Sequence, residues 1–217
     1  MKIIAFGNSR YKRIAHNWAL YLHRHGIENY TIYSLDQDIY DYLVENEINT
    51  ELLDLNIFNK KTWSWDVRVK CIIRLLDQGH DILHSDLDAI WLKNPLDLVE
   101  EKYDLIASTG KFPQNIYKKI GYTLCMGWIY YKSSTIIKEL FQDILDKNTH
   151  DNFDDQIEFN REIFNGNWQN LKLKTLDQSI ISRAQPHDNN TYVSHPLSNK
   201  NTDREKFLKD KNLWILK

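Results

Sequence analysis

The stretch His84-Ser85-Asp86-Leu87-Asp88-Ala89-Ile90-Trp91-Leu92-Lys93-Asn94-Pro95 places two carboxylates, one residue apart, directly after the apolar run Ile82-Leu83. Successive side chains of an extended chain alternate faces, so Asp86 and Asp88 are expected to point the same way, with Cα atoms about 7 Å apart. Two neighbouring anions are costly inside a protein unless a cation joins them. Mg²⁺ or Mn²⁺ typically binds one or two carboxylates together with substrate phosphate oxygens. The pair therefore predicts a divalent ion that faces a diphosphate.

The alternative interpretation is that both residues are solvated and belong to an ordinary turn, because Asp-x-Asp often occurs by chance. The context favours the metal. The pair follows a strand pattern that reads as buried, and it is followed by the bulky run Ile90-Trp91-Leu92 and by the stop signal Asn94-Pro95. Ligand sites of α/β sheets lie at such carboxyl ends of strands.

The size and composition of the chain are typical of one enzyme-sized domain. Its 217 residues include seven Gly and four Pro, and no linker-like segment divides them. The net charge of −2 argues against broad nucleic-acid binding. Cys71 and Cys125 are too few for a disulfide framework or a zinc cluster and are expected to be reduced core residues. No apolar stretch of about 20 residues is present, so we expect no transmembrane segment and a soluble, cytoplasmic protein.

Strand and helix patterns alternate along the first half of the chain. This alternation predicts an α/β fold in which helices cover both faces of a mostly parallel sheet, as in Rossmann-like nucleotide-binding folds. The second half changes rhythm and predicts a mixed sheet. The expected strands are 3–6, 30–33, 52–53, 82–83, 103–108, 122–131 and 171–176, and the clearest helices are 14–25, 64–78, 136–145 and 156–164. Neither a G-x-G-x-x-G loop nor a P-loop is present, which disfavours dinucleotide dehydrogenases and P-loop enzymes.

Four separated segments, in this order and spacing, resemble the nucleotide-diphospho-sugar transferase family of glycosyltransferases. They are Val67 to Pro95, Gly121 to Tyr131, Asp154-Asp155-Gln156 with Asn160, and His195-Pro196. The resemblance covers about Ser64 to Leu216 and implies a glycosyltransferase A fold. It implies one catalytic domain over 1–217, in which about 1–95 binds nucleotide and metal and about 96–217 binds the donor sugar and the acceptor.

The resemblance also implies the chemistry and the metal ligands. Mn²⁺ or Mg²⁺, held by Asp86, Asp88 and His195, would face the diphosphate of a nucleotide sugar, with UDP the commonest donor nucleotide, and a glycan or other hydroxyl would be the acceptor. Asp86 would also lie near the ribose. His195 is otherwise interpreted as a loop histidine, and imidazole suits Mn²⁺ better than Mg²⁺. Lys200 would contact the phosphates or remain solvated.

Further donor contacts are expected near the first strand and on the helix before the metal strand. Asn8 and Arg10 lie where the first loop of this fold meets base and ribose, which is inference from position alone. Arg68 or Lys70 would bind phosphate, and Arg68 is favoured because a guanidinium reads phosphate bidentately. One of these two basic residues is expected on a solvated helix face.

The resemblance assigns the reacting centre to Asp155 and Gln156. Asp155 would bind donor hydroxyls, act as a base or stabilise positive charge on the sugar, and these roles stay open. Asp154 or Asp155 is expected to cap the following helix. Gly127 would let the backbone approach the donor sugar, or else mark a bulge. Trp128 is the tryptophan expected to contact a sugar ring, although large aromatics are usually core residues.

Two other functions are consistent with parts of the pattern. A non-catalytic protein could hold a nucleotide sugar or a glycan without turnover, which the complete acidic set disfavours. A Mg²⁺-dependent phosphohydrolase also uses Asp-x-Asp, but its nucleophile usually ends the first strand, whereas this pair lies in mid-chain.

Overall fold

Alternating strands and helices build a mixed α/β fold, as predicted. The computed structural model describes residues 1–217 except 61, 148–152, 184–185 and 198–202. The hydrogen-bonded order of its seven-stranded sheet is β3-β2-β1-β4-β7-β6-β8. The chain divides into two units that interleave along the sequence. One unit comprises 1–2, 54–84 and 99–176, and the other comprises 3–53, 85–98 and 177–217. The single-domain organisation and its two halves stay predictions.

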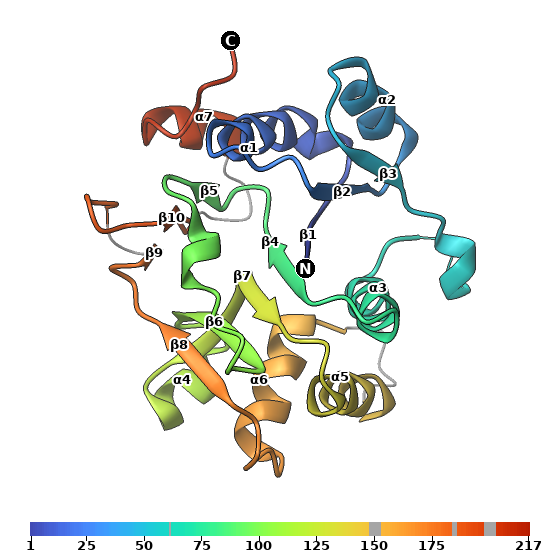
Figure 1. The fold of residues 1–217 in the computed structure, drawn as a ribbon, viewed down its shortest axis with the longest axis vertical. Coiled ribbons are helices and arrows are strands. Elements are labelled where there is room, and N and C mark those ends of the chain that lie inside the picture. Colours follow the sequence, from blue (N-terminus) through green and yellow to red (C-terminus); the bar gives the residue numbers. More distant parts are fainter. Residues whose placement is uncertain (61, 148–152, 184–185, 198–202) are drawn as a thin grey trace. The chain divides into compact units, whose positions relative to one another are not determined.

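Parallel strands and two amphipathic helices open the unit that begins at Ile3. The strands are β1 (Lys2–Gly7), β2 (Tyr30–Ser34) and β3 (Thr50–Leu52), and β2 pairs in parallel with both of the others. The helices α1 (Lys12–Arg24) and α2 (Gln37–Glu45) follow β1 and β2 (Figure 1). Helix α1 buries the apolar positions that predicted it, Ile14, Trp18 and Leu22. The predicted β-α alternation of this region is confirmed.

The same unit contains a small second sheet that the sequence patterns did not predict. Its strands are β5 (Ile90–Trp91), β9 (Ile181–Ser182) and β10 (Val193–Ser194), and their order is β5-β10-β9. Strand β10 runs antiparallel to β5 and parallel to β9. Two-residue strands carry no detectable periodicity, so pairing between distant segments, and not local pattern, creates this sheet.

The other unit supplies the mixed part of the sheet. Strand β6 (Leu105–Gly110) pairs antiparallel with β7 (Thr123–Tyr131) and parallel with β8 (Leu173–Leu176). Strand β4 (Ile82–Ser85) follows α3 (Trp65–Asp77) in the chain. The change from a parallel to a mixed sheet in the second half is confirmed.

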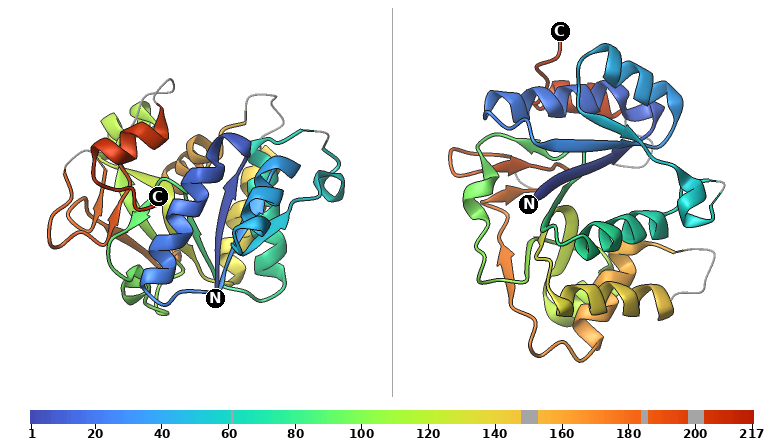
Figure 2. Two further views of the ribbon diagram at one scale, coloured as in Figure 1. Left: turned by 90° about the horizontal axis from the view of Figure 1, so that it is seen from above. Right: turned by 45° about the vertical axis from the view of Figure 1, so that its right-hand side comes forward.

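Helices of this unit pack closely with one another. Helix α3 lies beside α5 (Thr135–Lys147), as Figure 1 and the right view of Figure 2 show, and α5 contacts α6 (Asp155–Asn165). The remaining elements of the described residues are the helices α4 (Gln114–Ile120) and α7 (Arg204–Asp210) and the 3₁₀ turns η1 (Ser9–Tyr11), η2 (Leu55–Phe58) and η3 (Pro95–Leu98). None of the helices in the described part of the chain is both long and apolar enough to cross a membrane.

The backbone at the acidic pair differs from the extended chain expected from the sequence. Strand β4 ends at Ser85, and the next residues form a turn in which the Ala89 N–H donates to the Asp86 carbonyl at 3.0 Å. The expectation of two carboxylates on one face of a strand was therefore wrong. A turn closed between residues i and i+3 brings its side chains together by curvature and not by alternation.

Ser85 fixes the start of this turn. Its Oγ accepts hydrogen bonds from the indole N–H groups of Trp18 at 3.3 Å and Trp91 at 3.1 Å, and it donates to the Asp86 carbonyl at 3.2 Å. The two tryptophans meet edge to face with ring centroids 6.0 Å apart, and both are fully buried. One hydroxyl thus connects the aromatic core of this unit to the backbone of the acidic turn.

The Ser85→Ala variant should lower the free energy of unfolding by about 2 kcal/mol or more, because it leaves two buried indole N–H groups without an acceptor. Urea denaturation at neutral pH measures this loss. The Ser179→Ala variant, which removes an exposed hydroxyl that donates to Asp177, should change stability far less. Equal losses in the two variants would mean that Ser85 is no more than a local turn residue.

Candidate metal and donor-binding site

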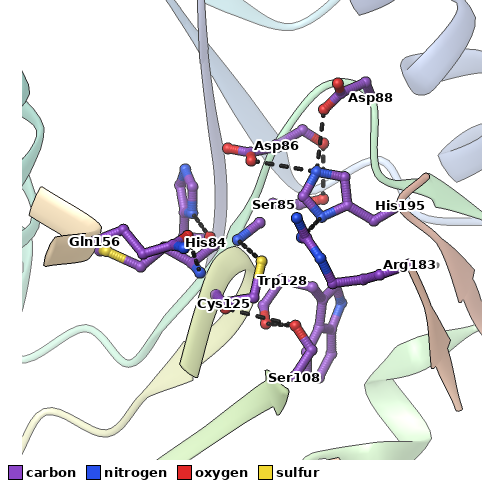
Figure 3. Close-up of polar contacts among 12 residues, drawn as sticks. His84, Ser85, Asp86, Asp88, Ser108, Cys125, Trp128, Gln156, Arg183 and His195 are labelled. Carbon is purple, nitrogen blue, oxygen red and sulfur yellow. Dashed lines mark hydrogen bonds and ion pairs between the residues drawn. The ribbon is translucent and has the colours of Figure 1, made fainter. Parts of the chain in front are cut away.

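Two carboxylates and one imidazole converge at the turn after β4. The Nε2 atom of His195 lies 3.5 Å from Asp86 Oδ2 and 3.4 Å from Asp88 Oδ1 (Figure 3). One ligand atom of each residue lies within 4.8 Å of the others, a grouping that could hold a metal ion. Asp88 and His195 are buried and Asp86 is half-buried. Hard oxygen ligands with one imidazole fit Mn²⁺ well and Mg²⁺ less well.

The small sheet explains why residues more than 100 positions apart meet here. The acidic turn directly precedes β5, and Ile90 of β5 pairs with Ser194 of β10. His195 is the next residue after β10, and its backbone N–H donates to the Ser182 carbonyl of β9 at 2.8 Å. The register of β10 with β5 therefore places His195 next to the acidic turn.

Two arginines that sequence reasoning missed contact two of these three ligands, Asp88 and His195. Arg204, the first residue of α7, places its Nη1 atom 2.7 Å from Asp88 Oδ2. Arg183, the first residue after β9, donates from Nη1 to His195 Nδ1 at 2.6 Å. Figure 3 shows Arg183 reaching His195 on the side away from the carboxylates. In the parallel pair of β9 and β10, Ser182 lies opposite Ser194, so Arg183 and His195 follow as neighbours.

The charges around Asp88 control its protonation. Burial alone would raise the pKa of Asp88, but the His195 ring and the Arg204 and Arg183 guanidinium groups outweigh burial and lower the pKa below its ordinary value of 3.8. Tyr11, which also lies next to Arg204, responds in the opposite direction. Burial raises the pKa of Tyr11 above 10.0, and the Asp88 charge adds to the rise. At neutral pH, Asp88 is therefore an anion and Tyr11 a neutral phenol.

The second group of candidate residues lies in the other unit and centres on Asp155. Its carboxylate forms a buried ion pair with Arg68 of α3, and the Arg68 guanidinium also stacks on the Trp65 ring at 4.6 Å. The cap of α6 is instead Asp154, whose side chain accepts from the Ile157 N–H at 2.9 Å. The question of which acid caps the helix is thus resolved, and Asp155 is left for another role.

The choice between the two basic residues of α3 is also informed by the structure. Lys70 pairs with Asp66, one turn earlier on the same helix, at 2.9 Å and is partly exposed. Arg68 is buried beside the candidate acid, so it is Lys70 that lies on the expected solvated face. Binding of phosphate by Arg68 stays a prediction.

Gln156 contacts an irregularity in β7 through Met126, the residue before Gly127. The pairing of β6 with β7 shifts register between Ala107 and Ser108, so β7 has extra residues around Gly127. Gln156 Oε1 accepts from the Met126 N–H at 3.2 Å, and His84 Nδ1 donates to the Met126 carbonyl at 2.7 Å (Figure 3). The alternative that Gly127 marks a β-bulge is therefore confirmed.

Ser108 also supports this bulge, and Trp128 ends it. The Ser108 hydroxyl lies 3.5 Å from the Cys125 carbonyl and 3.4 Å from the Trp128 carbonyl. Trp128 is fully buried, so its ring is part of the core of this unit. The sugar contacts of Gly127 and Trp128 stay predictions. Cys125 and Cys71 are buried, as expected.

The remaining predicted contacts lie at the first loop and near the C-terminus. Asn8 is exposed and caps η1, since its side chain accepts from the Arg10 N–H at 3.2 Å. Arg10 is exposed as well. Their roles toward base and ribose stay predictions. Lys200 lies outside the described residues.

Comparisons with known proteins identify the family and the fold. A family model described as nucleotide-diphospho-sugar transferase matches residues 25–206. The chain superposes on the galactosyltransferase LgtC in complex with donor and acceptor sugar analogues, with a TM-score of 0.62, 14% identity and coverage of 100% of this chain and 97% of that one. It also superposes on mouse xyloside xylosyltransferase 1, with a TM-score of 0.60, 11% identity and coverage of 93% of this chain and 99% of that one.

A third similar structure is a glycosyltransferase involved in glycosylation of the major capsid of PBCV-1, with a TM-score of 0.56, 11% identity and coverage of 98% of both chains. At these identities the likeness shows the fold, which is that of glycosyltransferase A enzymes. Among curated protein sequences, none matches this chain significantly.

The lowered pKa of Asp88 predicts a specific dependence of stability on pH. A depressed native pKa contributes stability that is present above the unfolded pKa, near 3.8, and is lost as pH falls through the lower native value. The free energy of unfolding of the wild type should therefore fall relative to that of Asp88→Asn as pH falls from 5 to about 3. Urea denaturation at a series of pH values measures this difference. A difference that does not change over this range would contradict the assigned charge environment.

Proposed function

Because this chain belongs to the nucleotide-diphospho-sugar transferase family and is a glycosyltransferase, we propose that it transfers a sugar from a UDP-sugar to a hydroxyl acceptor with the help of a divalent ion. The observation that carries the metal dependence is the convergence of Asp86, Asp88 and His195. Mn²⁺ is the proposed ion, because one of the three ligands is an imidazole.

The proposed metal ligands would hold an ion that stabilises the leaving group. Cleavage of the bond between the anomeric carbon and the phosphate leaves a nucleoside diphosphate with growing negative charge, and a bound divalent ion supplies Lewis-acid stabilisation of that charge. Asp88 is suited to hold the ion because it is buried and ionised at neutral pH. Asp86 is more exposed, which leaves it room to contact the ribose as well.

Asp155 is proposed to act on the donor sugar. A carboxylate next to a guanidinium is a poorer proton acceptor, because the positive charge favours its anionic form. Of the three open roles, we therefore favour binding of sugar hydroxyls and stabilisation of positive charge over that of a base. Arg68 holds the carboxylate in place, and Gln156 is held by the bulge of β7 through Met126.

One assay separates the proposed activity from its alternatives. The protein is incubated with Mn²⁺ and a panel of nucleotide sugars and simple sugar acceptors, and the released products are identified. A transferase releases nucleoside diphosphate, a phosphohydrolase releases inorganic phosphate, and a non-catalytic binder releases neither. Release of inorganic phosphate alone would replace the proposed function by the phosphohydrolase.

The Asp88→Ala variant should reduce nucleoside diphosphate release roughly 100-fold or more, because it removes a buried metal ligand. The matched control is Asp97→Ala, which removes an exposed carboxylate of η3 in the same unit and should retain wild-type turnover. Full activity in Asp88→Ala would contradict the metal assignment.

Asp155→Asn should slow transfer by roughly 100-fold or more and leave the dissociation constant of UDP nearly unchanged, because Asp155 is proposed to act on the sugar and not on the nucleotide. The neighbouring Asp154→Ala variant removes only the cap of α6. It should cost about 1 kcal/mol of stability and leave transfer unaffected. Steady-state kinetics together with calorimetric UDP titrations compare the two. If both variants lose activity equally, Asp155 has no role beyond that of a structural acid.

A further inference from the structure

Two of the three proposed metal ligands already contact a cationic side chain. Asp88 Oδ2 faces Arg204 Nη1 at 2.7 Å, and His195 Nδ1 faces Arg183 Nη1 at 2.6 Å. Both arginines are half-buried, and both belong to the same unit as the ligands. The arginines and a divalent ion would therefore compete for the same anionic and imidazole groups.

Competition at Asp88 is electrostatic. The pair of Arg204 and Asp88 is a charge-assisted hydrogen bond to a carboxylate that is only 10% exposed. A divalent ion bound between Asp86, Asp88 and His195 would put two positive charges close to the guanidinium. Repulsion between these like charges, in a site with little water, weakens the hold of Asp88 on Arg204.

Competition at His195 follows from the hydrogen-bonding capacity of the ring. A guanidinium only donates, so His195 Nδ1 must accept from Arg183, and in a neutral ring the proton is then on Nε2. Nε2 is the atom that faces both carboxylates and would bind the ion. Coordination needs the Nε2 lone pair, which moves the ring proton to Nδ1, and Arg183 then loses its acceptor.

The charges show where the released arginines would go. The two carboxylates and the two guanidinium groups nearly cancel one another, so a bound divalent ion leaves about two positive charges in excess. The diphosphate of a nucleotide carries two or more negative charges, and arginine binds phosphate oxygens bidentately.

We propose that Arg204 and Arg183 act as counter-cations of the metal ligands. The ion displaces both arginines from these ligands, and both arginines then bind the donor diphosphate. Metal and nucleoside diphosphate therefore bind cooperatively. This inference rests on the proposed function. It assigns the two arginines a positioning role: they weaken the binding of the metal alone and strengthen the binding of the nucleotide once the metal is present.

Helix α7 provides the matched control for the test. Arg13 of α1 pairs with Glu205, the residue next to Arg204, at 3.0 Å. Arg13→Gln removes one positive charge and one ion pair with the same helix, but Arg13 contacts none of the metal ligands. The Arg204→Gln variant removes one positive charge at the ligands themselves.

The experiment measures Mn²⁺ binding by isothermal titration calorimetry, without and with UDP, and UDP binding in the presence of Mn²⁺. Arg204→Gln should bind Mn²⁺ alone about tenfold more tightly than wild type and should bind UDP about tenfold more weakly. UDP should therefore raise Mn²⁺ affinity less in this variant than in wild type. Arg183→Gln should behave similarly, Arg204→Lys should lie between Arg204→Gln and wild type, and Arg13→Gln should match wild type.

The outcomes separate the inference from the proposed function. Unchanged or weaker binding of Mn²⁺ alone to both glutamine variants, with wild-type binding of UDP, would overturn the exchange of arginines and leave the metal-dependent transferase intact. An equal change of Mn²⁺ and UDP affinity in Arg13→Gln would mean that Arg204→Gln acts only through general charge or through anchoring of α7, which would also overturn the exchange. Absence of Mn²⁺ binding to the wild type, even with UDP, would contradict the proposed function itself.

Discussion

The repulsion between Asp86 and Asp88 is the constraint on which the site depends. A turn that brings two carboxylates together around a buried imidazole is stable only if positive charge is close by. In this protein Arg204 and Arg183 supply that charge, the His195 ring faces both carboxylates through Nε2, and the lowered pKa of Asp88 reflects all three groups. An acidic cluster built in this way is prepared for a cation, which agrees with the membership of the chain in a family of nucleotide-sugar transferases.

Much of the fold follows from local pattern. Helix α1 buries the residues whose spacing predicted it, and α3 buries Val69, Ile72 and Leu76 but leaves Trp65 exposed. Gly26 and Gly79 follow these helices in the left-handed conformation that favours glycine. The strand before the acidic turn was found because its apolar run, Ile82-Leu83, is visible in a single sequence. Strands β5, β9 and β10 were not found, because two-residue strands have no periodicity.

The same limit explains which site residues could be predicted. The two acids of the turn stand out as a motif, and His195 was found only through resemblance to a family. Arg183 and Arg204 carry no motif, and they reach the ligands because pairing of β9 with β10 and the start of α7 bring them there. The assignment of the helix cap to Asp154, and not to Asp155, likewise needed side-chain positions.

The proposed function depends on a divalent ion bound between Asp86, Asp88 and His195. Anomalous diffraction from crystals grown with Mn²⁺ and UDP would locate such an ion. We expect a strong manganese peak within bonding distance of oxygen atoms of both carboxylates and of His195 Nε2. A peak elsewhere, or no peak while these side chains keep their present contacts, would contradict it.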